Sequence, residues 1–414
     1  MYMLIDCDNF FVSCERVFQP HLNRRPVVVL SNNDGCVVSR SDEAKQLGIA
    51  MCAPYFKIER LLKSIGGIAL SSNYELYADL SRRIMTYLRQ TFSGIEVYSI
   101  DEAFVSVSGF ANYYTLASQI RQNILQYFGI PVSIGIAATK TLCKIASHFA
   151  KRQFKLYQLT SAAQIREQLA QTDIIDLWGV GRHLAPKLNH LGIFTAADLA
   201  AMPLAQARSA FGIGLAKTIM ELNQTPAFEL ETPELSQSLI SSGSFETEIQ
   251  NRDTLEANLA EFVDCACLRL RQQKAVARGI WISVYSNRFN LNHPQYNNSC
   301  LISLPTPSCN TANFMTAMRQ GLDHIYRPDC WYKRAGVTLI GLEKADVLQT
   351  DLLQSTPLAP KEQKLMSVFD ELNRKFGRKT VYYAVQNKTA KSYLKREFRS
   401  PAFTTSWQDL PLVF

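Results

Sequence analysis

Three acidic residues in the first quarter of the chain have the type and the setting of metal ligands. Asp101 and Glu102 are adjacent and lie between two runs rich in Val, Ile, Tyr and Phe, and Asp6 ends another short apolar run. Such runs are typical of strands, on which neighbouring side chains point to opposite faces. Like charges held this close raise each other's pKa unless a cation lies between them. The acids therefore predict a divalent metal, and their origin in two distant segments indicates a two-metal site.

Basic residues in the same region could neutralise phosphate charge. Helical spacing places four of them on one stripe: Lys140, Lys144, His148 and Lys151. Lys45 projects from the first turns of a short helix that follows a Ser41 cap. A solvated basic face is the simpler interpretation of the stripe. Because acids lie elsewhere in the region and lysine supplies point charge to phosphates, we expect this helix to hold triphosphate oxygens.

The first 151 residues alternate between strand and helix patterns. The predicted strands cover residues 3–7, 26–30, 35–39, 96–100, 104–108 and 132–137. The predicted helices cover residues 9–17, 41–47, 74–91, 115–127 and 139–151. This order predicts a sheet with helices on one face and the acids on the other, open face.

Short helices with small turns replace this pattern from residue 173 to about residue 233. Within residues 177–193, Gly179 and Gly181 form a turn between two helical stretches, and Gly192 ends the second stretch. Glycines let the turn backbone approach a ligand closely, with amide N–H groups at a helix start, which suits a DNA phosphate. We expect a helix-hairpin-helix element that binds the DNA backbone, with a packing-only helical hairpin as the alternative.

Residues 239–344 show a third pattern, with the order βαββαβ. The predicted elements are the strand 242–249, the helix 254–273, the strands 277–286 and 299–304, the helix 310–325 and the strand 335–342. One face of the second strand is apolar, and the other carries Trp281, Ser283 and Tyr285. We expect this domain to offer a DNA-backbone surface, with a solvated rim as the alternative. Its basic residues are Arg269, Arg271, Lys274 and Arg278.

The chain beyond residue 345 is less regular. Residues 346–360 predict a Pro-flanked linker, in which Gln349–Leu353 has the pattern of a peptide that docks in a hydrophobic groove. From residue 361 we expect a helix to Phe376, a strand over residues 377–384 and then a basic, aromatic tail. Residues 361–414 contain eleven Lys or Arg and five Asp or Glu, so +6 of the net charge of +8 lies in this last segment.

The composition of the 414 residues bounds the class of protein. With 47% apolar and 19% charged residues the chain can bury sizeable cores, and its length predicts two to four domains. It has no apolar run of about 18 residues and no signal-peptide pattern, so we expect a cytoplasmic protein that enters no membrane. The ten cysteines form no CxxC pair, which predicts reduced core residues. The net charge of +8 permits a polyanionic partner.

Several motifs resemble those of a known family. They are Asp6–Phe11, Leu30–Cys36, Glu43–Lys45, Ser72–Asp79 and Tyr98–Phe104. On these motifs the chain resembles the Y-family translesion DNA polymerases, and within them the bacterial UmuC branch, to which the catalytic subunit of DNA polymerase V belongs. The likeness runs essentially from end to end. It implies an α/β (α+β) multidomain fold with palm, fingers, thumb and little finger.

The resemblance also implies domain boundaries. The palm would occupy residues 1–165, with the fingers inserted at about 20–75. The small helical thumb with the helix-hairpin-helix element would occupy residues 166–235, and the βαββαβ little finger residues 239–345. A linker at 346–360 would carry a peptide similar to the family's clamp-binding peptide, and 361–414 would form a basic C-terminal tail that binds partners.

Asp6, Asp101 and Glu102 are similar to the metal-binding carboxylates of the family, with the backbone carbonyl of Cys7 as a further ligand. The resemblance implies two Mg²⁺ ions at these oxygens and a catalytic role for Asp101 and Glu102. One ion would lower the pKa of the primer 3′-hydroxyl, and the other would hold the leaving pyrophosphate. The implied reaction is nucleotidyl transfer from a deoxynucleoside triphosphate to the primer.

Four residues are implied to contact the incoming nucleotide: Phe10, Phe11, Lys45 and Lys151. Lys45 and Lys151 lie where the family carries triphosphate-binding cations. Phe11 lies at the steric-gate position, where a ring beneath the sugar collides with a 2′-hydroxyl. Many relatives have Tyr at this position. Asp42 stands where some members place a Tyr that contacts the triphosphate, so nucleotide binding is expected to be weaker here.

The function implied by the resemblance is error-prone translesion synthesis on primed, damaged DNA in the SOS response. The implied partners are a UmuD′-type dimer and a RecA filament, with the tail as a contact region, and a sliding clamp bound by Gln349–Leu353. A nucleotidyl cyclase also uses a palm with two metals, but it has no use for modules that grip a duplex. A catalytically silent scaffold for repair proteins is the non-enzymatic alternative, against which the intact acids argue.

Overall fold

The structure is a computed structural model that describes residues 1–152, 155–231, 236–290, 292–345, 360–377, 379–386 and 396–411, with the backbone alone for 360–363. The chain divides into two compact units, one of Met1–Pro233 with Glu397–Phe414 and one of Glu234–Arg396. The predicted clamp-binding peptide Gln349–Leu353 lies outside the described residues. Of the helices within those ranges, none is long and apolar enough to span a bilayer.

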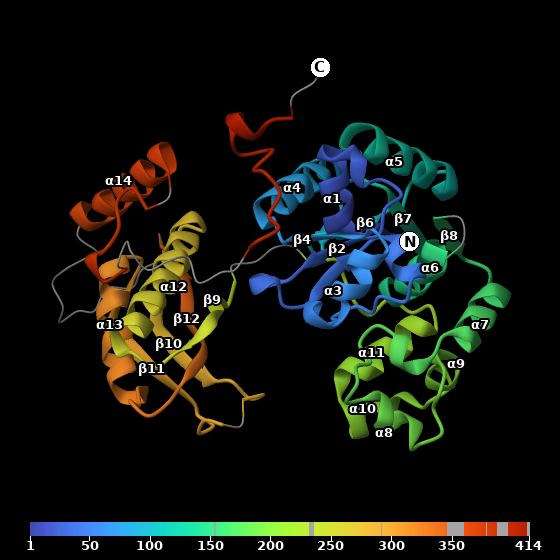
Figure 1. Ribbon diagram of the computed structural model, residues 1–414. Coiled ribbons are helices and arrows are strands. Elements are labelled where there is room, and N and C mark those ends of the chain that lie inside the picture. The colour runs from blue at the N-terminus through green and yellow to red at the C-terminus, as the bar shows by residue number, and fades with distance from the viewer. Residues whose placement is uncertain are drawn as a thin grey trace. The chain divides into compact units, whose positions relative to one another are not determined.

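A five-stranded sheet forms the centre of the first unit (Figure 1). The strand β1 (Tyr2–Cys7) lies in the middle and is antiparallel to both of its neighbours. Its sequence is apolar up to Asp6 and buried almost throughout, as expected of a strand covered on both faces. The spatial order of the sheet is β5 (Ile95–Val97), β6 (Glu102–Ser106), β1, β7 (Val132–Ala137) and β8 (Leu156–Leu159).

Helices cover both faces of this sheet. Three cover one face: α1 (Phe10–Phe18), α4 (Tyr74–Thr91) and α5 (Tyr113–Phe128). On the opposite face, α6 (Lys140–Arg152) packs on Leu4 and Phe104 together with shorter helices of the thumb. Figure 1 shows α1, α4 and α5 on one side of the sheet and the thumb helices on the other. The prediction of a sheet with one open face is therefore wrong, because α6 and the thumb cover part of the face that carries the acids.

The close approach of α6 to the sheet requires Gly135 in β7. An added Cβ at Gly135 would lie 2.5 Å from the carbonyl oxygen of Cys143 and nearer still to the backbone nitrogen of Ser147. Real side chains do not occupy such distances, and the obstacles belong to backbone that cannot rotate away. The backbone of α6 therefore lies directly on β7, which brings the lysines of the helix over the sheet.

A second, three-stranded sheet is inserted between α1 and α4, within the range predicted for the fingers. Its spatial order is β3 (Val37–Arg40), β2 (Val27–Leu30) and β4 (Ile68–Ser71). Ser41 caps the short helix that follows β3, as predicted, by accepting the N–H of Ala44. The connecting elements are η1 (Pro20–Leu22), η2 (Asn32–Asp34), α2 (Asp42–Gln46) and α3 (Tyr55–Ser64). The sequence patterns did not predict α3, β4 or β8, the last two being strands of only four residues.

The region predicted as the thumb is a set of short helices that Glu221 fixes to α6. This fully buried carboxylate accepts two hydrogen bonds from Thr141, one from the backbone N–H and one from Oγ1, each 2.8 Å long. Between the first two thumb elements and α8, Gly179 adopts φ +88°, which a glycine tolerates best. The elements are α7 (Ala162–Gln171), η3 (Ile174–Asp176), α8 (Ala185–Asn189), α9 (Ala196–Ala200), α10 (Leu204–Phe211) and α11 (Ile213–Leu222).

The second unit has the predicted order βαββαβ. Its four strands pair antiparallel in the order β11, β10, β12, β9, and α12 and α13 cover one face. Ile280, Ile282 and Val284 are fully buried, whereas Trp281 is 44% exposed, as the alternation predicted. The elements are β9 (Ser238–Ile249), α12 (Arg252–Gln272), β10 (Ala275–Ser286), β11 (Asn297–Ser308), α13 (Thr311–Ile325), β12 (Tyr332–Lys344) and α14 (Pro360–Phe376).

The strand predicted over residues 377–384 is absent from the part of that stretch that the structure describes. The chain turns after Gly377 instead and forms the 3₁₀ turn η4 (Ala384–Gln386). The side chain of Asn373 on α14 bonds both backbone groups of Val381, and the ring of Tyr383 packs on Phe369. The contacts with α14 provide hydrogen-bond partners for the backbone of Val381, so this residue needs no partner strand.

Candidate active site

Asp6 and Glu102 stand directly opposite each other in the antiparallel pair of β1 and β6. Residues opposite each other in such a pair have side chains on the same face, with Cβ atoms about 5 Å apart. Alternation along the strands puts Asp6 on the face of Leu4 and Glu102 on the face of Phe104, which is the face under α6. The two acids from distant segments therefore meet at one end of the sheet.

Asp101 occupies the turn between β5 and β6. Its carbonyl accepts the backbone N–H of Cys7 at 2.9 Å, which ties the turn to the end of β1. Ser99 Oγ donates to Asp101 Oδ1 at 2.6 Å and fixes the carboxylate. The carbonyl of Glu102 accepts the N–H groups of Tyr98 and Ser99, so the hairpin closes without Gly or Pro. Asp101, Glu102 and the end of β1 are thus held together by the backbone.

Two lysines of α6 point at the acid pair. Lys144 Nζ lies 2.8 Å from Oε2 of Glu102, and Lys151 Nζ lies 2.6 Å from Oδ2 of Asp6. Lys144 also lies 4.3 Å from the centroid of the Tyr98 ring, a cation–π contact. These two members of the basic stripe therefore pair with the acids of the sheet, although the side chain of Lys151 remains 45% exposed.

Lys140 shows that the predicted stripe does not act as a unit. Its side chain is 3% exposed, and Nζ lies 2.6 Å from Oε2 of Glu96 and donates to the carbonyl of Glu229 at 3.1 Å. A buried lysine held by an acid on β5 and by a backbone carbonyl joins these elements structurally. The prediction that Lys140 holds triphosphate oxygens is therefore wrong.

Burial sets the protonation of the acid pair. It raises the pKa of Asp6 to about 8, against the lowering effect of the Lys151 ammonium, and Glu102 raises it further. Burial acts in the same sense on Glu102, but the hydrogen bond with Asp6 and the ammonium of Lys144 outweigh it and lower its pKa. The surroundings of the pair therefore favour a proton on Asp6 and the charged form of Glu102.

This donor set fits a hard divalent cation on chemical grounds. Two facing carboxylates, the carboxylate of Asp101 and the backbone carbonyl of Cys7 are oxygen ligands of the kind that Mg²⁺ prefers. Within the described ranges, no three His, Cys, Asp or Glu side chains form a group that could hold a metal by themselves. The ammonium groups of Lys144 and Lys151 take the positions next to the acids in this structure.

The helix α1 begins beside the acids and carries the predicted nucleotide-contacting rings. Phe10 is 3% exposed and packs in the core, which leaves its backbone at the helix start as the part nearest a ligand. Phe11 is half-buried, and its ring stacks on Tyr77 with the centroids 4.4 Å apart and the planes at 12°. Tyr74 packs against the same ring in a T-shaped arrangement, with the ring centroids 5.9 Å apart. Two tyrosines of α4 thus fix the ring of Phe11.

Lys45 is connected to the start of α1 through Asp42. Its Nζ lies 3.0 Å from Oδ1 of Asp42, which also accepts a hydrogen bond from Nδ2 of Asn9, the residue before the helix. Asp42 therefore links the predicted phosphate-binding lysine to the helix start. Burial would raise the pKa of Asp42, but the bonds from Asn9 and Lys45 outweigh it and lower the pKa.

The sequence patterns missed Lys155. Its Nζ lies 3.3 Å from Oδ2 of Asp8, whose Oδ1 accepts a hydrogen bond from Ser133. Lys155 follows α6 in a left-handed conformation, with φ 63°, so no helical periodicity marks it. Together with Lys45 and Lys151 it brings three ammonium groups around the start of α1.

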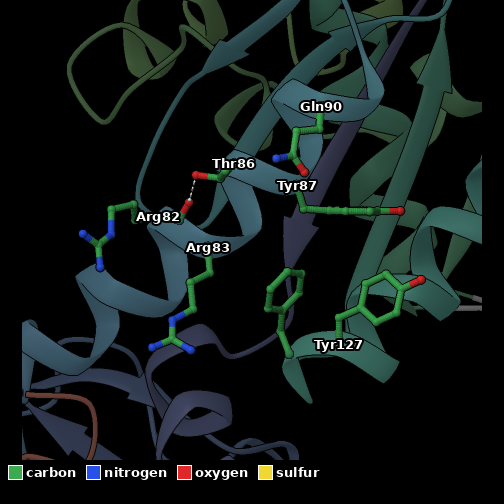
Figure 2. A pocket seen from close by; sticks show the side chains of 7 residues that line it. Arg82, Arg83, Thr86, Tyr87, Gln90 and Tyr127 are labelled. Carbon is green, nitrogen blue, oxygen red and sulfur yellow. Dashed lines mark hydrogen bonds between the residues drawn. The ribbon is translucent and has the colours of Figure 1, made fainter.

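A pocket of about 540 Å³ lies on the face of α4 and α5 and contains none of the predicted site residues (Figure 2). Figure 2 shows Arg82, Arg83 and Tyr87 from α4, with Tyr127 from α5 across the opening. Arg83 Nε donates to Asp79 at 2.9 Å. The pocket is therefore separate from the acid pair.

The predicted DNA-binding elements differ in the contacts that their side chains make within the protein. Trp178 precedes the turn of Gly179 and Gly181 and donates from Nε1 to the Tyr98 hydroxyl at 2.9 Å, so the turn begins beside the hairpin of the acids. In the second unit, by contrast, Arg271 makes two hydrogen bonds of 2.7 Å to Asp370 on α14. Arg271 therefore serves the packing of α14 and not a free basic surface.

Solved structures with the same architecture define the class of this fold. A chimeric Y-family DNA polymerase of Dbh and Dpo4 is similar with a TM-score of 0.69 and 23% identity, over 84% of this chain and 99% of that chain. DinB from Sulfolobus solfataricus is similar with a TM-score of 0.54 and 24% identity, over 82% and 98%. The chain thus has the fold of the Y-family DNA polymerases.

Sequence comparisons narrow this class. Residues 5–148 and 236–352 match the impB/mucB/samB family and its C-terminal domain, 163–193 match the helix-hairpin-helix motif of that family, and 363–413 match a domain of unknown function. UmuC of Salmonella typhimurium is 39% identical over 99% of both chains, and ImpB of Salmonella typhimurium is 35% identical over 100% and 99%. DNA polymerase IV of Dehalococcoides mccartyi is 29% identical over 91% and 94%.

The chain therefore belongs to the impB/mucB/samB family, in the UmuC branch of the Y-family translesion DNA polymerases. It is a DNA-directed DNA polymerase.

Proposed function

We propose that the chain extends primed, damaged DNA with deoxynucleoside triphosphates in the SOS response, by nucleotidyl transfer that depends on two Mg²⁺ ions. The observation that carries the proposal is the facing pair of Asp6 and Glu102, with Asp101 tied to the end of β1. Acids that are gathered from two distant segments at one end of the sheet suit metal-assisted nucleotidyl transfer.

Asp6, Asp101, Glu102 and the carbonyl of Cys7 would hold the ions. Bound Mg²⁺ would supply Lewis-acid chemistry, which activates the primer 3′-hydroxyl and neutralises charge on the leaving pyrophosphate. The backbone ties of the hairpin fix the acids before the nucleotide arrives, so little reorganisation is needed at the moment of reaction.

The triphosphate would be held by the start of α1 and the lysines around it. The first N–H groups of a helix point outward and favour an anion, and Phe10 and Phe11 contribute theirs here. Lys45, Lys151 and Lys155 supply the positive charge. Lys151 pairs with Asp6 in this structure, and its flexible side chain would supply positive charge to a phosphate oxygen when Asp6 holds a metal ion.

Phe11 would select the sugar. A ring that is fixed beneath the ribose leaves no room for a 2′-hydroxyl, and the stack on Tyr77 keeps this ring from moving aside. Phenylalanine in place of tyrosine retains the ring and omits the hydroxyl, so selection would be purely steric.

The proposed partners are a UmuD′-type dimer, a RecA filament and a sliding clamp. The support is the full-length likeness to UmuC of Salmonella typhimurium, which includes the C-terminal region. Gln349–Leu353 would bind the clamp.

A primer-extension assay tests the proposal. The purified chain is given Mg²⁺, the four deoxynucleotides and a primed template with or without a single abasic site, in the presence and absence of the accessory dimer and RecA filament. We expect extension that depends on the template and passes the abasic site. Cyclic product formed without template would favour a cyclase, and tight DNA binding with no extension in any condition would favour a silent scaffold.

A further inference from the structure

The C-terminal residues 397–411 are distant in the sequence from the rest of the first unit, but they pack on it (Figure 1). Phe398 pairs with Ser71 at the end of β4: the N–H of Ser71 donates to the carbonyl of Phe398, and the N–H of Phe398 donates to Ser71 Oγ, each at 3.0 Å. The N–H of Glu397 donates to Asp34 Oδ2 at 3.0 Å. The segment therefore continues the edge of the fingers sheet.

Two aromatic contacts fix the same segment. Phe403 is 7% exposed and stacks on Phe18 of α1, with the centroids 4.9 Å apart and the planes at 6°. Phe398 meets Tyr55 of the fingers edge to face at 5.8 Å. The segment thus contacts both the fingers and the helix that carries Phe11.

A buried carboxylate lies where the segment meets α1 and α4. Glu15 is fully buried, and its Oε1 accepts hydrogen bonds from the Tyr77 hydroxyl at 2.7 Å and from Ser400 Oγ at 3.0 Å. Ser400 in turn accepts from Nδ2 of Asn73 at 2.9 Å. A buried carboxylate depends on such donors, because an unsatisfied charge inside a protein is costly. One of the donors comes from the C-terminal segment.

Tyr77 connects this carboxylate to the active site. Its hydroxyl is held by Glu15, while its ring carries the stacked ring of Phe11. Ser400, Glu15, Tyr77 and Phe11 therefore form a continuous path of contacts from the C-terminal segment to the gate.

We propose that the segment 397–411 acts as a positioning element for sugar selection, in which Ser400 and Glu15 hold Tyr77 so that the ring of Phe11 stays beneath the ribose. The inference rests on the proposed role of Phe11 as the gate. A steric gate works over a fraction of an ångström, so loss of a donor at Glu15 allows Tyr77 and Phe11 to shift enough to admit a 2′-hydroxyl. It also gives a role to part of the region that matches a domain of unknown function.

The test is the ratio of kcat/KM for a ribonucleotide to kcat/KM for the matching deoxynucleotide, measured in the full chain. Ser400→Asp places a second carboxylate against Glu15 and should raise the ratio about tenfold, whereas Ser400→Ala removes one hydrogen bond and should raise it about threefold. Thr405→Asp adds the same charge to an exposed position of the same segment and should leave the ratio at the wild-type value. Both kcat/KM values scale with the fraction of enzyme that is folded, so this fraction cancels in their ratio. A variant that is partly unfolded therefore still gives a valid ratio.

Phe11→Ala separates the role of Phe11 as the gate from the role of the segment 397–411. If it raises the ratio and Ser400→Asp adds nothing further in that background, the path through Phe11 is supported. If Phe11→Ala raises the ratio but neither Ser400 variant does, or if Ser400→Asp raises it equally with and without Phe11, the inference is overturned while the gate stands. If Phe11→Ala leaves the ratio unchanged, the gate assignment itself fails, and the inference fails with it.

Discussion

Lys151 Nζ lies 2.6 Å from Oδ2 of Asp6, so a lysine expected to hold phosphate contacts an acid expected to hold metal. Burial raises the pKa of Asp6 to about 8, and Asp6 in turn raises the pKa of Lys151, whose partial burial acts in the opposite sense. The ammonium group of Lys151 thus lies beside Asp6, close to the proposed site of the nucleotide phosphates.

Lys151→Ala should weaken nucleotide binding more than it slows chemistry. Loss of a point charge that pairs with a phosphate is worth about 1–2 kcal/mol, so KM for the incoming deoxynucleotide should rise about tenfold. Steady-state extension by a single nucleotide measures this. Lys63→Ala, which removes an exposed lysine of α3, is the control and should leave KM unchanged. Equal KM values for the wild type and Lys151→Ala would remove Lys151 from the nucleotide site.

Phe11→Ala should admit ribonucleotides. The substitution removes the ring that the Tyr77 stack fixes, and the ratio of ribonucleotide to deoxynucleotide incorporation should rise about 100-fold or more. Competition assays with both nucleotides on one primed template give this ratio. Phe56→Ala, which truncates a 74% exposed phenylalanine of the fingers, provides the control. If the ratio rose equally in both variants, sugar selection would not depend on Phe11.

Gly135→Ala should lift α6 off the sheet. The added Cβ would collide with the helix backbone at Cys143 and Ser147, which should lower the free energy of unfolding by roughly 1–3 kcal/mol and reduce extension by displacing Lys144 and Lys151. Denaturant midpoints and extension rates test this. Gly214→Ala, in α11 with nothing within 4 Å of the new Cβ, should cause neither loss. A Gly135→Ala protein as stable and as active as the wild type would show that α6 is free to move.

Glu15 should make the stability of the first unit depend on pH. Burial raises the pKa of Glu15, and the hydrogen bonds from Tyr77, Ser400 and Gln19 offset this only in part. The folded state therefore binds a proton more tightly than the unfolded state, so the free energy of unfolding should fall as pH rises from the ordinary pKa of Glu to the raised value.

Glu15→Gln removes this dependence and keeps an acceptor for the Tyr77 and Ser400 hydroxyls. The free energy of unfolding of the wild type minus that of Glu15→Gln should therefore decrease as pH rises from the ordinary pKa of Glu to the raised pKa of Glu15. Denaturant titrations of both proteins over a pH series measure it. A difference that grows in favour of the wild type with rising pH would mean that the pKa of Glu15 is lowered by its surroundings.

The meeting of Asp6 with Glu102 was predictable, because strand patterns give both the alternation of faces and the ends of strands. The same patterns gave β1, β7 and the order βαββαβ of the second unit with small errors in their bounds. Periodicity also put Lys144 and Lys151 on one face of a helix. It could not show that this face lies over the acids, because the packing of a helix on a sheet is decided by non-local contacts such as the one at Gly135.

Other features carried no sequence signal of their own. Lys140 has the same spacing as its neighbours, but its partner Glu96 comes from a distant strand, so its burial could not be inferred. The docking of residues 397–411 depends on pairing with Ser71, more than 300 positions away, and the strand predicted at 377–384 failed because Asn373 satisfies the backbone of Val381 locally. For Lys140 and for residues 397–411 the deciding partner is distant in the sequence. Asn373 lies only 8 positions from Val381, but a single side chain that bonds a nearby backbone leaves no periodic signal.

Primer extension by Asp101→Ala with Mg²⁺ and deoxynucleotides, measured beside the affinity of the same variant for primed DNA, tests whether the acids form the metal-binding centre. We expect extension to fall at least about 100-fold while the affinity for DNA stays close to that of the wild type. Asp323→Ala, which removes an exposed acid of the second unit, should extend normally. Extension by Asp101→Ala at the wild-type rate would contradict the assignment of the acids as the metal-binding centre of the polymerase.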